Sequence, residues 1–223
     1  MSFVVPFSLE GVSNINHFVK REAEAKQMDV LLNPDGTAER KLVVLYGMGG
    51  IGKTQLAADF ARRHKERFSA IFWIDGSSQD SVRRGLVACV ARLPSDSERS
   101  LTSHIDVTNH MNMDTDARIE RFMAWLTQKE NTKWLLIFDN VDREFSVTTN
   151  DPQAYDFGRY IPRSSHGNIL VTTRVASLKK EGKSIIIGTV NKNQAREMLE
   201  YDDNGARHPV ASMFKILLHK RCD

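Results

Sequence analysis

Residues 47–54 read GMGGIGKT and fit the pattern GxxxxGK[ST] throughout. Glycines at this spacing let successive main-chain N–H groups turn inward toward phosphate oxygens, and a helix starting near Lys53 adds the positive end of its dipole. The Lys53 ammonium can reach the β- and γ-phosphates, and the Thr54 hydroxyl can ligate Mg²⁺. The pattern therefore predicts a nucleoside triphosphate site. The loop residues expected to bind the nucleotide are Gly47, Met48, Gly49, Gly50, Ile51, Gly52, Lys53 and Thr54.

A magnesium site also needs a carboxylate, and Asp139 directly follows the apolar run WLLIF at residues 134–138. We expect Asp139 to hold the metal through its waters. Asn140 comes next, where an acidic residue would be the natural base for activating water, and an amide cannot accept that proton. Asp142 is expected to lie too far round the turn to replace it. Hydrolysis is therefore expected to be slow or absent, while nucleotide binding survives.

The apolar segment GNILVTT at residues 167–173 ends in a pair of threonines, and Arg174 follows it directly. If this segment is a strand beside the one that leads to Asp139, the planar guanidinium of Arg174 can sense the γ-phosphate. The alternative is an exposed arginine at a strand end without a ligand. Lys53, Asp139 and Arg174 together form the expected catalytic set.

Five short apolar runs must position these groups, at residues 42–46, 70–74, 134–138, 168–172 and 184–188. Continuous apolar runs of this length are typical of strands that helices cover on both faces. Segments with helical periodicity lie between them, as at Val82, Leu86 and Val90. Strands alternating with helices predict a three-layer α/β fold with a mostly parallel five-stranded sheet. Two stretches, 94–114 and 143–167, are predicted to be long loops.

The composition is that of a soluble globular protein, with 223 residues of which 41% are hydrophobic and 26% charged. Collagen, coiled coil and wholesale disorder are excluded. The two cysteines cannot form a disulfide framework or a four-cysteine zinc site; Cys89 is expected in the core, and His166 on the surface or in a loop. No apolar run is long enough to cross a bilayer, so we expect a cytoplasmic protein. The net charge of +3 arises from interspersed acids and bases, and nucleic acid is not an expected partner.

Taken in order, these segments resemble the NB-ARC class of STAND P-loop NTPases, the nucleotide switch of NOD-like receptors. GMGGIGKTQLA looks like the family's Walker A motif, which adds Gln55 to the binding residues, LLIFDNVD looks like its Walker B motif, and GNILVTTR is similar to its sensor strand. FVKRE at residues 18–22 resembles the hhGRE motif, with Lys20 in place of glycine. The sequences of these motifs are most similar to those of fungal NB-ARC repeat proteins.

The resemblance implies a P-loop NTPase sandwich that binds ATP or ADP with Mg²⁺ and controls the assembly of other protein domains or chains in signalling. It also implies that Val19 and Arg21 border the adenine and ribose. We expect an N-terminal segment at 1–36, the nucleotide-binding domain at 37–200 and a tail at 201–223, truncated before the family's helical and winged-helix domains. A small-molecule kinase and an AAA+-like DNA-associated ATPase remain the alternatives; no arginine-bearing lid pattern is recognisable in residues 143–167.

Overall fold

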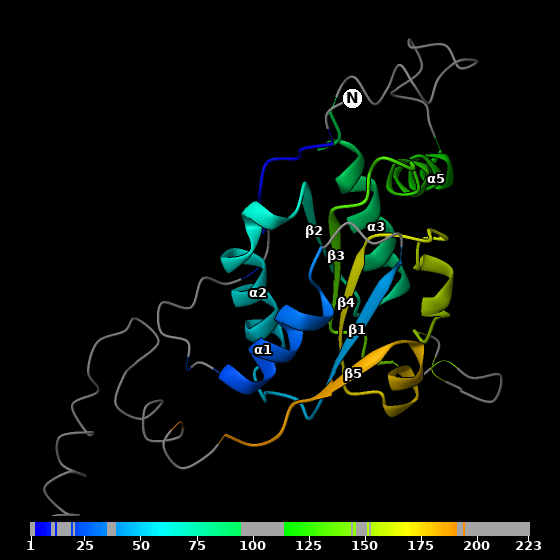
Figure 1. Ribbon diagram of the computed structural model, residues 1–223. Coiled ribbons are helices and arrows are strands. Elements are labelled where there is room, and N and C mark those ends of the chain that lie inside the picture. The colour runs from blue at the N-terminus through cyan, green and yellow to red at the C-terminus, as the bar shows by residue number, and fades with distance from the viewer. Residues whose placement is uncertain are drawn as a thin grey trace, which may run out of the picture.

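The computed structural model describes residues 3–9, 12, 19, 21–34, 39–94, 114–143, 145, 151, 153–190 and 194. Its five strands form one sheet in the order β2-β3-β4-β1-β5, and every neighbouring pair is parallel (Figure 1). The predicted three-layer α/β architecture is confirmed, with a sheet that is fully rather than mostly parallel. Three predicted features lie outside the described residues: part of the FVKRE motif, most of the loop at 94–114, and the tail at 201–223.

The elements follow the predicted runs closely. The strands are β1 (Lys41–Tyr46), β2 (Ala70–Asp75), β3 (Trp134–Asp139), β4 (Asn168–Thr173) and β5 (Lys183–Ile186). The α-helices are α1 (Glu22–Leu31), α2 (Lys53–Arg63), α3 (Gln79–Val90) and α5 (Thr115–Leu126). Short 3₁₀ turns lie at η1 (Lys65–Arg67), η3 (Phe157–Tyr160) and η4 (Ala176–Glu181).

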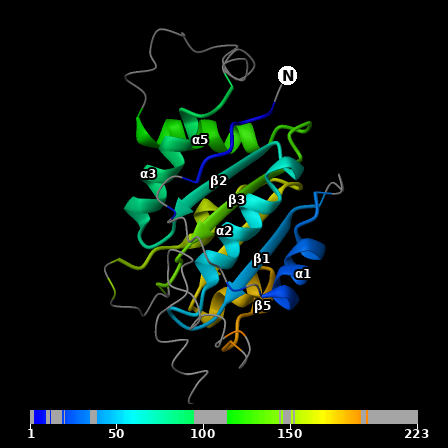
Figure 2. The same cartoon turned by 90° about the vertical axis from the view of Figure 1, so that its left-hand side faces the viewer.

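Two hydrophobic cores lie on opposite faces of the sheet, because successive strand residues point to opposite sides. On β3, Leu136 and Phe138 belong to the core shared with α3 and α5, whereas Leu135 and Ile137 belong to the core shared with α1 and α2. Figure 2 shows α1 and α2 in front of the sheet and α3 and α5 away from them. Coverage of both faces explains why the strand sequences are continuously apolar rather than alternating.

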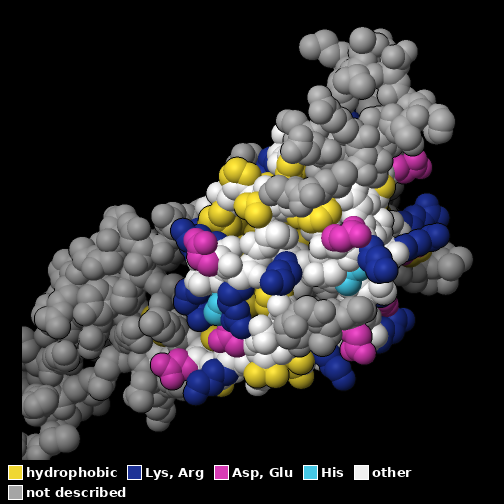
Figure 3. Space-filling model, turned by 45° about the horizontal axis from the view of Figure 1, so that its top comes forward, with side chains coloured by type: hydrophobic (Ala, Val, Ile, Leu, Met, Phe, Trp, Pro, Cys, Tyr) yellow, Lys and Arg dark blue, Asp and Glu magenta, His cyan; other side chains and the backbone are white. Residues whose placement is uncertain are grey.

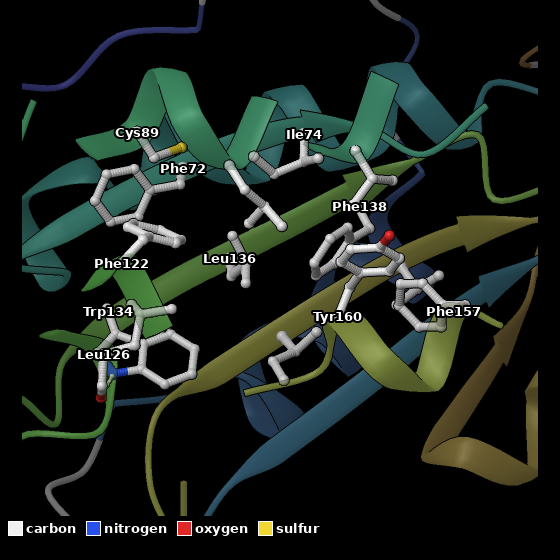
Figure 4. Close-up of a cluster of buried hydrophobic side chains, with 14 of the residues drawn as sticks. Phe72, Ile74, Cys89, Phe122, Leu126, Trp134, Leu136, Phe138, Phe157 and Tyr160 are labelled. Atoms are coloured by element: carbon white, nitrogen blue, oxygen red, sulfur yellow. Dashed lines mark hydrogen bonds between the residues drawn. The ribbon is translucent and has the colours of Figure 1, made fainter. Parts of the chain in front are cut away.

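Aromatic rings dominate the core on the α3 and α5 side (Figure 4). Phe72 meets Phe122 edge-on with ring centroids 4.8 Å apart, and Phe138 meets Phe157 edge-on at 5.0 Å. Such pairs contribute about 0.5–1.5 kcal/mol each beyond the area they bury. The second contact attaches the turn η3 to the middle of the sheet, so part of the predicted loop at 143–167 is ordered core structure.

The loop before β4 contains a buried histidine. His166 lies in a loop, as expected, but it is buried at 6% exposure rather than on the surface. Its Nε2 lies 3.1 Å from the carbonyl oxygen of Leu126, and its ring lies edge-on to Trp134. Trp134 is fully buried and donates its Nε1–H to the same carbonyl over 2.9 Å. The polar histidine is accommodated in the core because an acceptor is available there. Cys89 is buried, as predicted.

The surface shows no strong charge asymmetry on the face drawn in Figure 3. On that face, Lys and Arg side chains of the described residues alternate with Asp and Glu side chains and with uncharged groups. Of the helices that the structure describes, none has the length and apolar character that a membrane span requires.

Candidate functional site

The loop between β1 and α2 has the backbone conformation that its glycines permit. Gly50 and Gly52 have φ angles of 73° and 94°, in the left-handed region that glycine adopts without steric cost. Gly52 is also the N-cap of α2, and no side chain caps this helix end. The first turn of α2 contains no acidic residue either. An anion would therefore meet an uncapped, positively polarised helix terminus.

Several main-chain N–H groups of this loop lack a partner. Among the described residues, no acceptor receives a hydrogen bond from the N–H groups of Gly50, Gly52, Lys53 or Thr54. Main-chain donors that lie close together and are unpaired are the groups that hold the phosphates of a nucleotide in loops of this kind. The loop therefore fits a polyphosphate.

Lys53 lies beneath the same loop and is 8% exposed. Its Nζ donates to the carbonyl oxygens of Gly47 over 2.8 Å and of Met48 over 2.9 Å. Burial lowers the pKa of Lys53, and this effect is partly opposed by the carboxylates of Asp142 and Asp139. The ammonium is thus held at the loop by two carbonyls and balanced by two acids.

Asp139 and Thr54 form the group of hard oxygen ligands that a magnesium ion requires. The Thr54 hydroxyl donates to Asp139 Oδ1 over 2.8 Å, and the Thr172 hydroxyl donates to the same oxygen over 2.6 Å. No described residue donates to Asp139 Oδ2, so that oxygen is available to a cation or to its waters. Burial raises the pKa of the Asp139 carboxyl, and the two hydroxyls partly offset this. The donor set fits Mg²⁺.

Asp139→Asn is expected to remove a pH-dependent loss of stability. The pKa of Asp139 is raised in the folded chain, so the folded state binds more protons and stability falls as pH rises from the ordinary aspartate value of 3.8 through the raised one. Asparagine keeps an oxygen for both hydroxyls and carries no charge. Urea unfolding from about pH 4 to about pH 7 should show a smaller decline for the variant than for the wild type. Identical pH profiles would contradict this expectation.

Arg174 lies at the end of β4, and the expected strand adjacency is present. β3 and β4 are neighbours, with Phe138 opposite Val171, so Asp139 and Arg174 follow adjacent strands at one edge of the sheet. The expectation that Asp142 lies too far round the turn is wrong, because Asp142 lines the cavity described below. Its carboxylate accepts hydrogen bonds from the Arg174 main-chain N–H over 2.7 Å and from Arg174 Nε over 2.5 Å.

The chain turns back because Asn140 adopts a left-handed φ of 66° and donates its N–H to Thr172 Oγ1 over 2.9 Å. Asparagine is among the few residues that tolerate this conformation. The same turn brings Asn140 and Asp142 to the rim of the glycine loop. Of these two, Asp142 is the side chain that the sequence had placed away from the site.

A cavity of about 280 Å³ lies between the glycine loop and the chain ends after β3 and β4. Asp139 does not line it but accepts a hydrogen bond from Thr54, which does. The cavity is lined by the glycine loop, the start of α2 and the ends of β3 and β4. Asn140, Asp142 and Thr172 line it although sequence reasoning had assigned them no ligand; for Thr172, the only signal was its place in the polar pair that ends β4. The lining residues are Gly49, Gly50, Ile51, Gly52, Lys53, Thr54, Gln55, Asn140, Asp142, Thr172 and Arg174.

Four of the residues predicted to bind nucleotide do not line this cavity: Val19, Arg21, Gly47 and Met48. Val19 and Arg21 are each 4% exposed. The Arg21 guanidinium donates to the carbonyl oxygens of Ile51 over 2.9 Å and of Gly188 over 3.0 Å. Arg21 therefore ties the glycine loop at Ile51 to the segment after β5.

Comparison with known proteins places the chain among ATPase domains. Residues 17–151 match the AAA ATPase domain family. A nucleotide-binding leucine-rich repeat (NLR)-like protein of Hyaloscypha variabilis is 25% identical over 210 residues, which are 89% of this chain and 19% of that protein. From Arabidopsis thaliana, putative disease resistance protein At4g19050 is 22% identical over 91% of this chain and 16% of that protein, and disease resistance protein RPP2B is 24% identical over 93% and 15%. The chain thus spans less than a fifth of the length of these relatives.

Solved structures share the fold. Cdc6p from Pyrobaculum aerophilum superposes with a TM-score of 0.51 at 14% identity, over 90% of this chain and 57% of that one. The ORC1 protein of Aeropyrum pernix gives a TM-score of 0.54 at 17% identity, over 83% of this chain and 49% of that one, and was solved in complex with DNA. The prediction that nucleic acid is not a partner is therefore wrong as a general exclusion, because a protein of this fold is seen on DNA. The even charge pattern that motivated it does not exclude DNA contact by this fold.

Proposed function

The chain belongs to the AAA ATPase domain family, and from that premise we propose that it is a regulatory switch that binds ATP or ADP with Mg²⁺ and hydrolyses ATP slowly or not at all. Its homology to NLR-like and plant disease resistance proteins supports a role in signalling rather than in metabolism. On this proposal the nucleotide domain spans residues 37–200, flanked by the segments 1–36 and 201–223.

One observation carries the proposal: the phosphate loop, Thr54 and Arg174 line a single cavity, and Asp139 accepts a hydrogen bond from Thr54. Lys53, Asp139 and Arg174 come from three separated parts of the sequence and lie at the carboxyl ends of neighbouring strands. Ligands of parallel α/β folds bind at that edge of the sheet. Mg²⁺, when bound with the nucleotide, would neutralise negative charge on the phosphate oxygens.

Each residue has a distinct proposed role. The unpaired N–H groups at Gly50, Gly52 and Lys53 hold phosphate oxygens, and the Lys53 ammonium adds a full positive charge. Thr54 and Asp139 hold the metal. Arg174 reads the terminal phosphate with guanidinium nitrogens that Asp142 does not use.

The weak hydrolysis follows from the groups around the cavity. Asn140 occupies the position after Asp139, and its amide cannot accept a proton from water. Asp142 is the remaining acid that lines the cavity, and Arg174 occupies its carboxylate. Among the described residues that line the cavity, no carboxylate is free to act as the general base.

Asn140→Asp is expected to raise the single-turnover rate of ATP hydrolysis by about 10²-fold or more, because a positioned general base contributes 10²–10⁴-fold in enzymes. Quenched single-turnover assays on the wild type and the variant measure this directly. The variant that also carries Lys53→Ala controls for contaminating ATPase. Rapid hydrolysis by the wild type, or no gain from the aspartate, would overturn the role given to Asn140.

The proposed output is nucleotide-controlled association with other protein domains or chains. The relatives named as NLR-like and disease resistance proteins are about five to six times longer than this chain, judging from the share that it covers, so the switch domain is a small part of each. Size-exclusion chromatography with light scattering, in ATP and in ADP, tests whether the bound nucleotide changes the assembly state.

The fold shared with ORC1 supports a second candidate, a DNA-associated ATPase. That function predicts hydrolysis stimulated by duplex DNA. The switch function predicts the same low rate with and without DNA. Steady-state ATPase assays over a range of DNA concentrations distinguish the two.

A further inference from the structure

The contact between Asp142 and Arg174 has an unusual form for a surface ion pair. Asp142 engages both the main-chain N–H and the Nε of the same arginine, at 2.7 and 2.5 Å. The Asp142 side chain is only 10% exposed, whereas the Arg174 side chain is 55% exposed. An acid that is largely covered thus holds the Nε end of a guanidinium that is otherwise exposed.

The other end of the guanidinium faces the glycine loop. A Cβ atom built on Gly49 would lie 3.1 Å from Arg174 Nη1, so the arginine occupies the space beside Gly49 that any other residue would partly fill. Among the described residues, no acceptor binds Arg174 Nη1 or Nη2. Arg174 lines the cavity, and the N–H groups of its Nη1 and Nη2 are therefore available to a ligand there.

We propose that Asp142 is a positioning residue that holds Arg174 against the glycine loop and thereby sets the discrimination between ATP and ADP. The inference rests on the proposed function, since it requires that Arg174 contacts the terminal phosphate. An arginine that is half exposed loses much rotamer freedom when it is ordered, and this cost weakens any ligand contact it makes. The Asp142 carboxylate orders the side chain before the nucleotide arrives.

The geometry also distinguishes positioning of Arg174 from a contact that would only block the phosphate site. The carboxylate uses Nε and the main-chain N–H, which leaves the planar Nη pair free to bind two phosphate oxygens in parallel. A contact that only blocked the cavity would compete with the phosphate for the Nη pair. The contacts seen here do not, so Asp142 and the phosphate can bind Arg174 at the same time.

The test is calorimetric titration of the full chain with Mg–ATP and with Mg–ADP. The variants are Asp142→Asn, Arg174→Ala and the double variant. We expect each single variant to lose about tenfold in ATP affinity with little change for ADP, and the double variant to lose no more than Arg174→Ala alone. Non-additivity of this kind is the signature of two residues acting as a unit.

Asp151→Asn is the matched control, because Asp151 pairs with Arg143 over 2.8 Å and does not line the cavity. It should leave the ratio of ATP to ADP affinity unchanged. If Asp142→Asn is less stable than the wild type, the ADP affinity measured on the same sample shows whether its site is intact.

The outcomes separate the two levels of the argument. Loss of ATP preference in Arg174→Ala together with a wild-type ratio in Asp142→Asn would overturn the inference and leave the proposed function standing. Tighter ATP binding by Asp142→Asn would also overturn it, since Asp142 would then be a block. No nucleotide binding by the wild type would remove both.

Discussion

Lys53→Ala is expected to abolish the stabilisation that ATP gives to this protein. A ligand present at 100 times its Kd stabilises the folded state by about 2.7 kcal/mol. The Lys53 ammonium is buried beneath the glycine loop and is held by the carbonyls of Gly47 and Met48, so its removal takes away both the positive charge and a brace of the loop. Thermal unfolding with and without Mg–ATP measures the difference.

The quantity to compare is the shift on adding nucleotide, since the loss of two hydrogen bonds also lowers the melting temperature of the free variant. Lys65→Ala is the matched control: Lys65 lies just past the same helix, is half exposed and pairs loosely with Glu66 at 3.9 Å. It should keep the full ATP shift. If Lys53→Ala also keeps it, the site is assigned to the wrong residues.

Gly167→Ala is expected to cost about 3 kcal/mol or more of folding free energy. Gly167 has a φ of 88°, which strains any other residue, and a Cβ placed on it would overlap the indole of Trp134. Trp134 cannot move aside easily, because it is fully buried and its Nε1–H is bonded to Leu126. Urea unfolding followed by tryptophan fluorescence measures the loss.

Gly188→Ala is the matched control for this variant. A Cβ at Gly188 meets nothing within 4 Å, and Gly188 has no positive φ, so the change should lie within about 0.5 kcal/mol of the wild type. A Gly167→Ala protein as stable as the Gly188→Ala protein would show that the strand β4 and the indole do not pack as described.

The sheet was largely predictable because burial on both faces leaves a strong sequence pattern. β3 is apolar from Trp134 to Phe138 and every one of these positions is buried. β5 shows where this reasoning fails. Its run at 184–188 resembles an internal strand, yet β5 spans Lys183–Ile186 at the edge of the sheet and Ile186 is 65% exposed. The order of strands in a sheet decides burial at its edges, and local sequence does not contain that order.

The residues of the site also divide into those that the sequence could predict and those that it could not. Lys53, Thr54 and Asp139 lie in contiguous motifs whose geometry follows from a strand and a turn, so their positions could be predicted. Arg174 could be predicted only on the condition that β4 lies beside β3. Asp142 was out of reach, because its position depends on a single left-handed residue, Asn140, and on the hydrogen bond from Asn140 to Thr172.

For Arg21 the resemblance predicts a location beside the nucleotide, and its contact with the adenine and ribose stays a prediction. The upstream motif places an arginine near the nucleotide, and the structure does bring Arg21 to the glycine loop. Its guanidinium donates to the carbonyls of Ile51 and Gly188, and Arg21 does not line the cavity. A motif conveys which part of the chain is near a site, whereas the donors and acceptors around a side chain determine what it binds.

Calorimetric titration of the wild-type chain with ATP, in the presence and absence of Mg²⁺, tests the central claim most directly. The account predicts saturable binding of one ATP per chain that Mg²⁺ strengthens, since unpaired loop amides, Lys53 and Thr54 line one cavity and Thr54 is hydrogen-bonded to Asp139. The titration is repeated at protein and nucleotide concentrations well above the dissociation constants of ordinary nucleotide sites. The absence of any heat of binding under those conditions would contradict the account.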